Sequence, residues 1–159
     1  MSERGRHEDV ALLALLRLRP KRATWEAIAN DVQLDGSARE ILARHAEETL
    51  FEDPEVKEAR ERAAADLSAW EEAGLDFVSI LSTRYPTQLA AVFNAPPFLF
   101  VQGTLLPADQ GMSVVGSRKA SPRGQAMAQD AARILAERGL TVIAGLAEGI
   151  DTVAHRAAI

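Results

Sequence analysis

Two short glycine-containing segments carry the clearest chemistry in this sequence. Residues 113–118 read Ser-Val-Val-Gly-Ser-Arg, and residues 145–151 read Gly-Leu-Ala-Glu-Gly-Ile-Asp. Each follows an apolar run and precedes a segment of helical character, so each has the form of a strand that turns into a helix. In an open α/β sheet two such strand ends form one crevice, where helix N-termini bind phosphate. The pair of segments therefore predicts a phosphate-binding site.

The first segment offers several groups suited to a phosphate. Gly116 has no side chain to hold a ligand away from the backbone, and Ser117 supplies a hydroxyl and an N–H group. Arg118 carries a guanidinium that can grip two phosphate oxygens at once. Lys119 belongs to a stretch, residues 111–124, that contains basic side chains and no acidic one. A simpler interpretation stays open, in which an ordinary β-turn leaves these cations in solvent.

The second segment places two glycines, Gly145 and Gly149, four positions apart. This spacing permits a sharply folded loop that lies against a ligand or against the first segment. We interpret Asp151 as the N-cap of the helix that follows. His155 lies one helical turn further on. Two alternatives stay open for its side chain: a contact with a ligand, or a structural hydrogen bond to the neighbouring loop.

The overall charge limits the kind of anion that such a site can hold. The chain has 159 residues, of which 47% are hydrophobic and 26% charged, and its formal net charge is −5. A protein that covers many phosphates of duplex DNA is usually strongly basic. Any nucleic-acid site must therefore be a local basic pocket on an acidic body. The length suits one ordinary domain or two small ones.

Several other kinds of site are disfavoured. The sequence has no cysteine, which excludes disulfides and cysteine-based metal sites and indicates the reducing cytoplasm. The three histidines lack ligand spacing, so we predict neither a metal nor another cofactor. No serine has a convincing histidine–carboxylate pair, and the dinucleotide fingerprint G-x-G-x-x-G is absent. The apolar run over residues 10–18 is too short for a membrane span and is interrupted by Arg17.

The first half of the sequence has helical character up to Gly74. Apolar residues at helical spacing predict a helix over residues 10–18 and further helices behind the capping residues Thr24, Ser37 and Asp53. Gly74 is a natural C-terminal stop for the last of them. We therefore predict a helical N-terminal domain over residues 1–74.

The remaining residues, 75–159, alternate between short strands and helices. Strands are predicted over residues 77–81, 98–101, 113–115 and 140–143. Ser121 caps a helix that carries Met127, Ala131, Ile134 and Leu135 on one face, and a last helix follows Asp151. This order predicts an α/β fold with the front part of a doubly wound, mostly parallel sheet. Because one complete crossover helix leaves such a sheet incomplete, we expect the sequence to be the front part of a longer protein or a truncated relative of one.

Several of these residues occur together, in the same order and spacing, in one known family. The shared residues are Tyr85, Pro86, Leu89, Pro97, Leu99, Gly103, the segments 114–118 and 145–151, and the pair Ala154 and His155. With them, residues 75–159 resemble the DprA/Smf family, the DNA-processing protein A of bacteria. The residues before Gly74 resemble the variable helical N-terminal domain of that family. Two positions depart from the family's pattern: Ala144, where serine is frequent, and Arg84, where an acidic residue is usual.

The resemblance implies a function in natural transformation, or competence. Members of the family bind single-stranded DNA and help to load the RecA recombinase, through an extended Rossmann-like domain with no known catalysis. The resemblance implies that Gly116, Ser117 and Arg118 are part of the DNA phosphate pocket and that residues 145–151 form the adjoining loop. In the family, homodimer formation and recombinase contact depend on later strands, a further basic loop and a C-terminal segment that this sequence does not contain.

We therefore predict a cytoplasmic DNA-processing protein that binds single-stranded DNA, needs no cofactor, is not an enzyme and acts with a RecA-type recombinase. The predicted phosphate-binding residues are Gly116, Ser117, Arg118, Lys119, Gly145, Gly149, Asp151 and His155. One alternative is a nucleotide-binding sensor or a nucleotide hydrolase of a related Rossmann-like fold, for which Glu148 is the acid inside the glycine-rich loop. Another is a truncated chain without function.

Overall fold

The computed structural model describes residues 3–47 and 53–159. Its contacts divide the chain into two compact units, the first ending at Pro107 and the second spanning Ala108–Ile159. The first unit contains the predicted helical region, and the second contains both glycine segments. Within the described ranges, no helix is long and apolar enough to cross a membrane.

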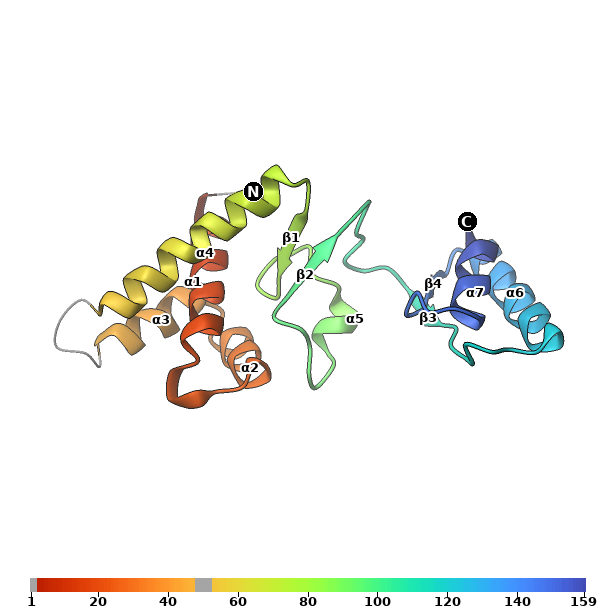
Figure 1. The fold of residues 1–159 in the computed structure, drawn as a ribbon, viewed down its shortest axis with the longest axis horizontal. Helices are drawn as coiled ribbons and strands as arrows, with labels where there is room; N and C mark the ends of the chain where they lie inside the picture. Colours follow the sequence, from red (N-terminus) through yellow and green to blue (C-terminus); the bar gives the residue numbers. More distant parts are fainter. Residues whose placement is uncertain (1–2, 48–52) are drawn as a thin grey trace. The chain divides into compact units, whose positions relative to one another are not determined.

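Helices α1 (Glu3–Leu18), α2 (Trp25–Asp35), α3 (Ala38–Glu47) and α4 (Pro54–Glu72) build most of the first unit, with a short 3-10 helix η1 (Pro20–Arg22) after α1. The other three α-helices all pack on α1, and α4 runs alongside it (Figure 1). Leu12 and Leu15 of α1 and Val32 of α2 are fully buried in this core. The predicted helical N-terminal region is confirmed.

Side-chain caps fix where three of these helices begin. The side chains of Thr24, Ser37 and Asp53 accept hydrogen bonds of 3.3, 3.2 and 2.8 Å from backbone N–H groups in the first turns of α2, α3 and α4. Each bond satisfies an N–H group that has no partner within the helix, and a cap of this kind contributes about 1 kcal/mol. The caps predicted from the sequence are confirmed.

An antiparallel pair of strands follows the helices. β1 (Asp76–Ser79) pairs with β2 (Phe98–Val101). Trp70 of α4 stacks on Phe77 at a ring-centroid distance of 5.9 Å and meets Phe100 edge-on at 5.0 Å. Each such aromatic pair adds about 0.5–1.5 kcal/mol beyond the area that it buries. These rings anchor the strand pair on the helices of the first unit.

This anchoring explains why the compact units divide after Pro107, whereas the sequence predicts a domain boundary near Gly74. The helical run does end just before Gly74. The two strands beyond it nevertheless pack aromatic side chains against Trp70 of α4. The end of the helical region and the end of the first compact unit are therefore different positions, and the division into residues 1–74 and 75–159 stays a prediction.

Tyr85 anchors the turn that leads into the short helix α5 (Thr87–Ala90). Its side chain is buried, and its hydroxyl donates a 2.7 Å hydrogen bond to the carbonyl oxygen of Pro96. Burial raises the pKa of Tyr85 to about 12. The preceding residue, Arg84, forms a bidentate ion pair with Asp76, and this hydrogen-bonded partner lowers the pKa of that carboxyl.

We expect Tyr85→Phe to destabilise the first unit by about 1–2 kcal/mol, because the carbonyl oxygen of Pro96 loses its donor. In the wild type, the unfolded chain releases the Tyr85 proton at its ordinary pKa of 10 and the folded chain at about 12. Stability is therefore lost as the pH rises from 10 to 12. Tryptophan fluorescence measures the unfolding of the first unit as a function of pH, since Trp25 and Trp70 both lie in that unit. If wild type and Tyr85→Phe lose stability equally over this pH range, the loss is not due to the ionisation of Tyr85.

The second unit is a strand–helix–strand arrangement with one further helix. β3 (Gly111–Ser113) pairs in parallel with β4 (Thr141–Ile143), α6 (Pro122–Glu137) connects them, and α7 (Ile150–Ala158) follows β4. The helices α6 and α7 lie side by side (Figure 1). Ala132 of α6, Val142 of β4 and Ala154 of α7 form the small core between these elements.

Two details of this unit differ from the sequence prediction. β3 ends two residues earlier than predicted, so residues 114–121 form a longer loop before α6, with Ser121 as the N-cap, as predicted. On α6, Met127 and Ile134 are exposed, and the buried residues are Ala128 and Ala132. The small side chains face inward because they let α6 approach α7 closely, which larger side chains would prevent.

The strands of the described ranges form two two-stranded sheets, whereas the sequence predicts a mostly parallel sheet. Parallel neighbours need a long crossover connection, usually a helix. The crossover helix α6 meets this need between β3 and β4, but the segment between β1 and β2 holds only the four-residue helix α5, and those strands pair antiparallel. The predicted class, a helical N-terminal region followed by an α/β part, is confirmed.

Candidate phosphate-binding site

The two glycine segments meet at the carboxyl ends of β3 and β4. Because these strands are parallel neighbours, loops 114–121 and 144–149 leave the sheet at the same edge. The Val114 N–H group donates a 2.9 Å hydrogen bond to the Ile143 carbonyl oxygen and extends the pairing to the base of both loops. Helices α6 and α7 begin where the loops end, so their free N–H groups add positive potential at this edge.

Gly149 brings the two loops into direct contact. Its backbone has φ 84° and ψ −123°, a conformation that favours glycine. A Cβ atom built on Gly149 would lie 2.3 Å from the carbonyl oxygen of Ser117 and 2.6 Å from that of Arg118. The next residue, Ile150, donates its N–H group to the Ser117 carbonyl oxygen at 3.3 Å. The contact between the loops is thus made by backbone, and a side chain at position 149 would prevent it.

Gly116 makes a second close approach. A Cβ atom built there would lie 2.6 Å from Cγ1 of Ile150, the first residue of α7. The sequence predicts a ligand in the space beside Gly116, and in the structure Ile150 fills this space. Gly116 therefore holds the start of α7 against the first loop, and its contact with a phosphate stays a prediction.

The cations of the first loop face solvent. Ser117, Arg118 and Lys119 are all exposed, and the Ser117 hydroxyl accepts a 3.1 Å hydrogen bond from the Lys119 N–H group. Among the residues that the structure describes, none forms a hydrogen bond or ion pair with the Arg118 guanidinium. Arg123 in the first turn of α6 adds an exposed cation, and Glu148 of the second loop is an exposed acid. The edge therefore presents excess positive charge with donors free to bind an anion.

Asp151 orders the second loop and does not cap α7. The N-cap of α7 is Gly149, so the cap function predicted for Asp151 is wrong. The buried carboxylate accepts N–H groups from Gly145 at 3.0 Å and Ala147 at 3.4 Å, both through Oδ2. The carboxylate thereby orders the second loop from within, and the contact of Asp151 with a phosphate stays a prediction.

We expect Asp151→Ala to destabilise the second loop by about 1–3 kcal/mol, because two partly buried N–H groups lose their acceptor. Asp151→Asn should remain close to wild type, since an amide oxygen in the place of Oδ2 keeps both bonds. Amide hydrogen exchange at Gly145 and Ala147 measures the effect. If Asp151→Asn opens the loop as far as Asp151→Ala does, the negative charge is what matters and the hydrogen-bonding account is wrong.

Two residues of α7 bond back to the second loop. His155 Nε2 lies 3.4 Å from the carbonyl oxygen of Ala144, at the base of the second loop, so the structural alternative for His155 is the one observed. Its contact with a ligand stays a prediction. Thr152 donates its hydroxyl to the Ala147 carbonyl oxygen at 2.8 Å, a loop contact that the sequence analysis missed. The sequence signal for this contact was Thr152 itself, a hydroxyl residue in the first helical turn after the glycine-containing loop.

Leu146 is a second residue that the sequence analysis missed. Its side chain is 81% exposed at the tip of the second loop, and its φ of 58° is unusual for a leucine. Val115, in the first loop, is 72% exposed. The signal was a leucine enclosed between two glycines. These side chains give the edge an apolar surface in addition to its cations.

Two kinds of chemistry find little support in this unit. Residues 108–159 contain no phenylalanine, tyrosine or tryptophan, so the unit itself offers none of these rings for a base to stack on. No three histidine, aspartate or glutamate side chains of the described residues cluster as a metal site. The arrangement is suited to binding an anion through backbone donors and guanidinium groups.

The part of the chain that carries this site matches known proteins. The family model for DNA recombination-mediator protein A matches residues 76–159. DNA processing protein DprA of Bacillus subtilis is 32% identical over 95 residues, which cover 58% of this chain and 32% of the relative. Protein Smf of Escherichia coli is 46% identical over 80 residues, which cover 49% of this chain and 21% of the relative.

A solved structure extends the similarity to the helical region. The X-ray structure of DNA processing protein A from Streptococcus pneumoniae matches with a TM-score of 0.61 and 26% identity, over 98% of this chain and 52% of that chain. The chain spans about a third or less of the length of the curated relatives that it matches. The resemblance identified from the motif residues is confirmed, and the family match covers more than half of the sequence. This chain belongs to the DNA recombination-mediator protein A family, whose curated members are named DprA or Smf.

Proposed function

We propose that this chain binds single-stranded DNA at the edge formed by loops 114–121 and 144–149, as part of DNA processing in natural transformation. The observation that carries the proposal is the backbone approach at Gly149, which holds the two loops, the starts of two helices and Arg118 at one edge. Membership of the DNA recombination-mediator protein A family supports DNA as the anion.

The proposed mechanism is phosphate capture without base reading. Arg118 grips two oxygens of one phosphate, and the Ser117 hydroxyl, which is engaged only as an acceptor in the structure, donates to an adjacent oxygen. Lys119 and Arg123 supply further positive charge. Contacts of this kind fix the strand's position and carry no sequence information. Leu146 supplies an apolar contact for the sugar or base of a strand without a complementary partner.

The proposed partners follow the family. A DNA recombination mediator acts with a recombinase, and we propose a RecA-type recombinase and a second copy of the whole protein as partners, in the cytoplasm. We further propose that the chain has no catalytic activity and needs no cofactor. The buried acid of the site, Asp151, is committed to two backbone N–H groups and is a poor candidate for a catalytic base.

The test is a titration of the chain with labelled single-stranded DNA, duplex DNA and a free mononucleotide. We expect single strands to bind most tightly, with the logarithm of the affinity falling linearly with the logarithm of the salt concentration. The slope should be shallow, about −0.7 for each phosphate contacted, because few cations converge on the edge. Equal affinity for duplex and single strand would contradict the proposal. Tight binding or hydrolysis of the mononucleotide would favour a nucleotide sensor or hydrolase instead.

A further inference from the structure

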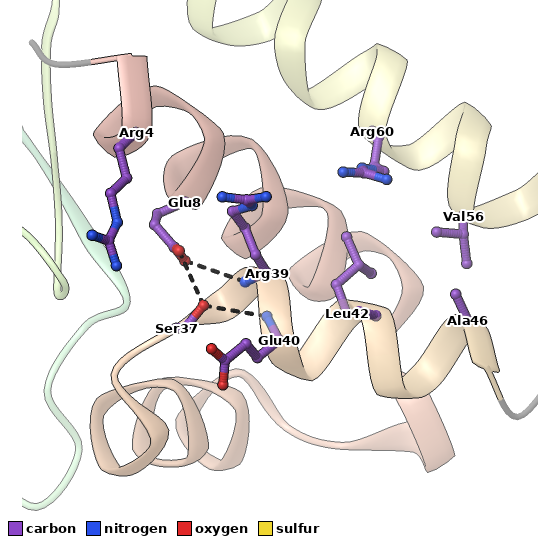
Figure 2. A pocket seen from close by; sticks show the side chains of 10 residues that line it. Arg4, Glu8, Ser37, Arg39, Glu40, Leu42, Ala46, Val56 and Arg60 are labelled. Atoms are coloured by element: carbon purple, nitrogen blue, oxygen red, sulfur yellow. Dashed lines mark hydrogen bonds between the residues drawn. The ribbon is translucent and has the colours of Figure 1, made fainter.

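We propose that the first unit carries a separate site for a phosphate-bearing ligand of nucleotide size, in a pocket between α1, α3 and α4. The cavity has a volume of about 320 Å³. The side chains that carry the argument are Arg4, Glu8, Arg39, Leu42, Val56 and Arg60 (Figure 2). This proposal is independent of the DNA site proposed above.

Three guanidinium groups from three different helices line the pocket. Arg39 of α3 and Arg60 of α4 extend into the space between those two helices, and Arg4 of α1 extends beside Glu8 (Figure 2). Within the described residues, none of the three forms an ion pair or a side-chain hydrogen bond. Elsewhere in this unit Arg19 and Arg22 also have no carboxylate partner among the described residues, whereas five arginines are paired: Arg6, Arg17, Arg44, Arg62 and Arg84. The three guanidinium groups outnumber the two acids of the lining, Glu8 and Glu40, so the pocket carries an excess of one positive charge.

The acid inside the pocket keeps its negative charge, but its two oxygens bond to uncharged donors and to none of the three guanidinium groups. The two carboxylate oxygens of Glu8 accept hydrogen bonds from the Ser37 hydroxyl at 3.0 Å and from the Arg39 N–H group at 3.2 Å (Figure 2). Glu8 thereby occupies the N-terminus of α3. The carboxylate of Glu40, the other acid that lines the pocket, points away from Arg39 and Arg60 in Figure 2.

The floor of the pocket is apolar. Leu42 and Val56 are 2% and 6% exposed, and they lie below the charged rim. Ligand pockets start at volumes of about 300 Å³, so the cavity suits a small molecule or a single nucleotide unit. A phosphate monoester concentrates nearly two negative charges on one group, which suits guanidinium groups that line one cavity better than carboxylates spread along a peptide do. The phosphate would lie at the arginines, with the sugar or base over Leu42 and Val56.

The test uses the whole chain in an Arg118→Ala background, which weakens the DNA site proposed for the second unit. Thymidine 5′-monophosphate is titrated calorimetrically at low salt, with thymidine as the uncharged control. We expect Arg39→Gln and Arg60→Gln each to weaken binding of the monophosphate by about tenfold to a hundredfold. Arg62→Gln is the matched control, because Arg62 is an exposed residue of α4 that pairs with Glu58 and does not line the pocket. Its affinity should equal that of the background.

A short oligo-dT strand in the same titration identifies the source of the phosphate. If the strand binds more tightly than the monophosphate and Arg39→Gln weakens both to the same extent, the site belongs to a DNA strand. If the monophosphate binds more tightly, the site belongs to a free nucleotide. Either order supports a phosphate site. Equal binding of thymidine, stronger binding of an acidic peptide, or unchanged affinity in Arg39→Gln and Arg60→Gln would overturn the proposal. Tryptophan emission confirms that the first unit stays folded in each variant, since it contains both tryptophans.

Discussion

Arg118→Ala is expected to weaken the binding of single-stranded DNA by about tenfold to a hundredfold, with no measurable loss of stability. A hydrogen bond to a charged group contributes about 1.5–3 kcal/mol, and about 1.4 kcal/mol corresponds to a factor of ten in affinity. The fold should not suffer, because Arg118 is exposed and its guanidinium has no partner among the described residues. Fluorescence anisotropy with a labelled strand measures the affinity, and thermal unfolding measures the stability.

Three further variants show whether the loss of affinity is due to the planar, bidentate guanidinium group of Arg118. Arg118→Lys should recover only part of the affinity, since an ammonium keeps the charge but cannot hold two oxygens in a plane. Lys119→Ala should have a smaller effect than Arg118→Ala. Arg138→Ala is the distant control, because Arg138 is exposed at the opposite end of α6 from the loops. If Arg118→Ala binds as wild type does, or if it unfolds the second unit, Arg118 is not the phosphate ligand.

The place of this site was predictable from the sequence because it depends on topology. Two apolar runs that end in glycine turns, joined by one crossover helix, must leave a parallel sheet at the same edge. The structure pairs β3 with β4 in parallel and brings residues 114–121 and 144–149 together there. The cap of Ser121 on α6 was predictable for a similar reason, since it depends only on residues three positions apart.

The functions of individual residues at the edge were harder to predict because they depend on tertiary contacts. An aspartate two residues after a glycine is a common helix cap, but the left-handed backbone of Gly149 starts α7 one residue before Asp151. The Asp151 carboxylate then reaches back to the loop and is buried there. Leu146 was missed because an apolar residue is usually buried, although its place between two glycines is the signal of a loop tip.

The arrangement of the strands was predictable only in the second unit. Strand positions near residues 77 and 98 follow from short apolar runs, and both strands exist. Their partner and direction do not follow from those runs. Trp70 of α4 contacts Phe77 and Phe100 and draws the pair onto the helices. A contact between an aromatic residue of a helix and rings up to thirty positions later leaves no periodic pattern in the sequence.

Gly149→Ala should have the largest structural effect of any single substitution at the site, a loss of about 3 kcal/mol or more of stability in the second unit. The added Cβ atom would lie 2.3 Å from the Ser117 carbonyl oxygen, and neither loop can retreat without breaking the hydrogen bond from the Ile150 N–H group. Strain of the backbone at a positive φ adds about 1–3 kcal/mol. Binding of single-stranded DNA should fall with the loop contact, even where the helices remain folded.

Gly139→Ala is the matched control for this effect. Gly139 lies in the same unit and has a positive φ of 71°, but a Cβ atom there would meet no atom within 4 Å. It should cost only about 1–2 kcal/mol, the ordinary penalty of a left-handed residue. Because residues 108–159 contain no tryptophan, tryptophan emission follows the first unit alone and should not change in either variant. Hydrogen exchange in α6, α7 and β4 then reports the second unit, where Gly149→Ala should lose far more protection than Gly139→Ala. Equal protection in the two variants would mean that the approach of the loops at Gly149 does not hold this edge together, and the proposed phosphate site would lose its structural basis.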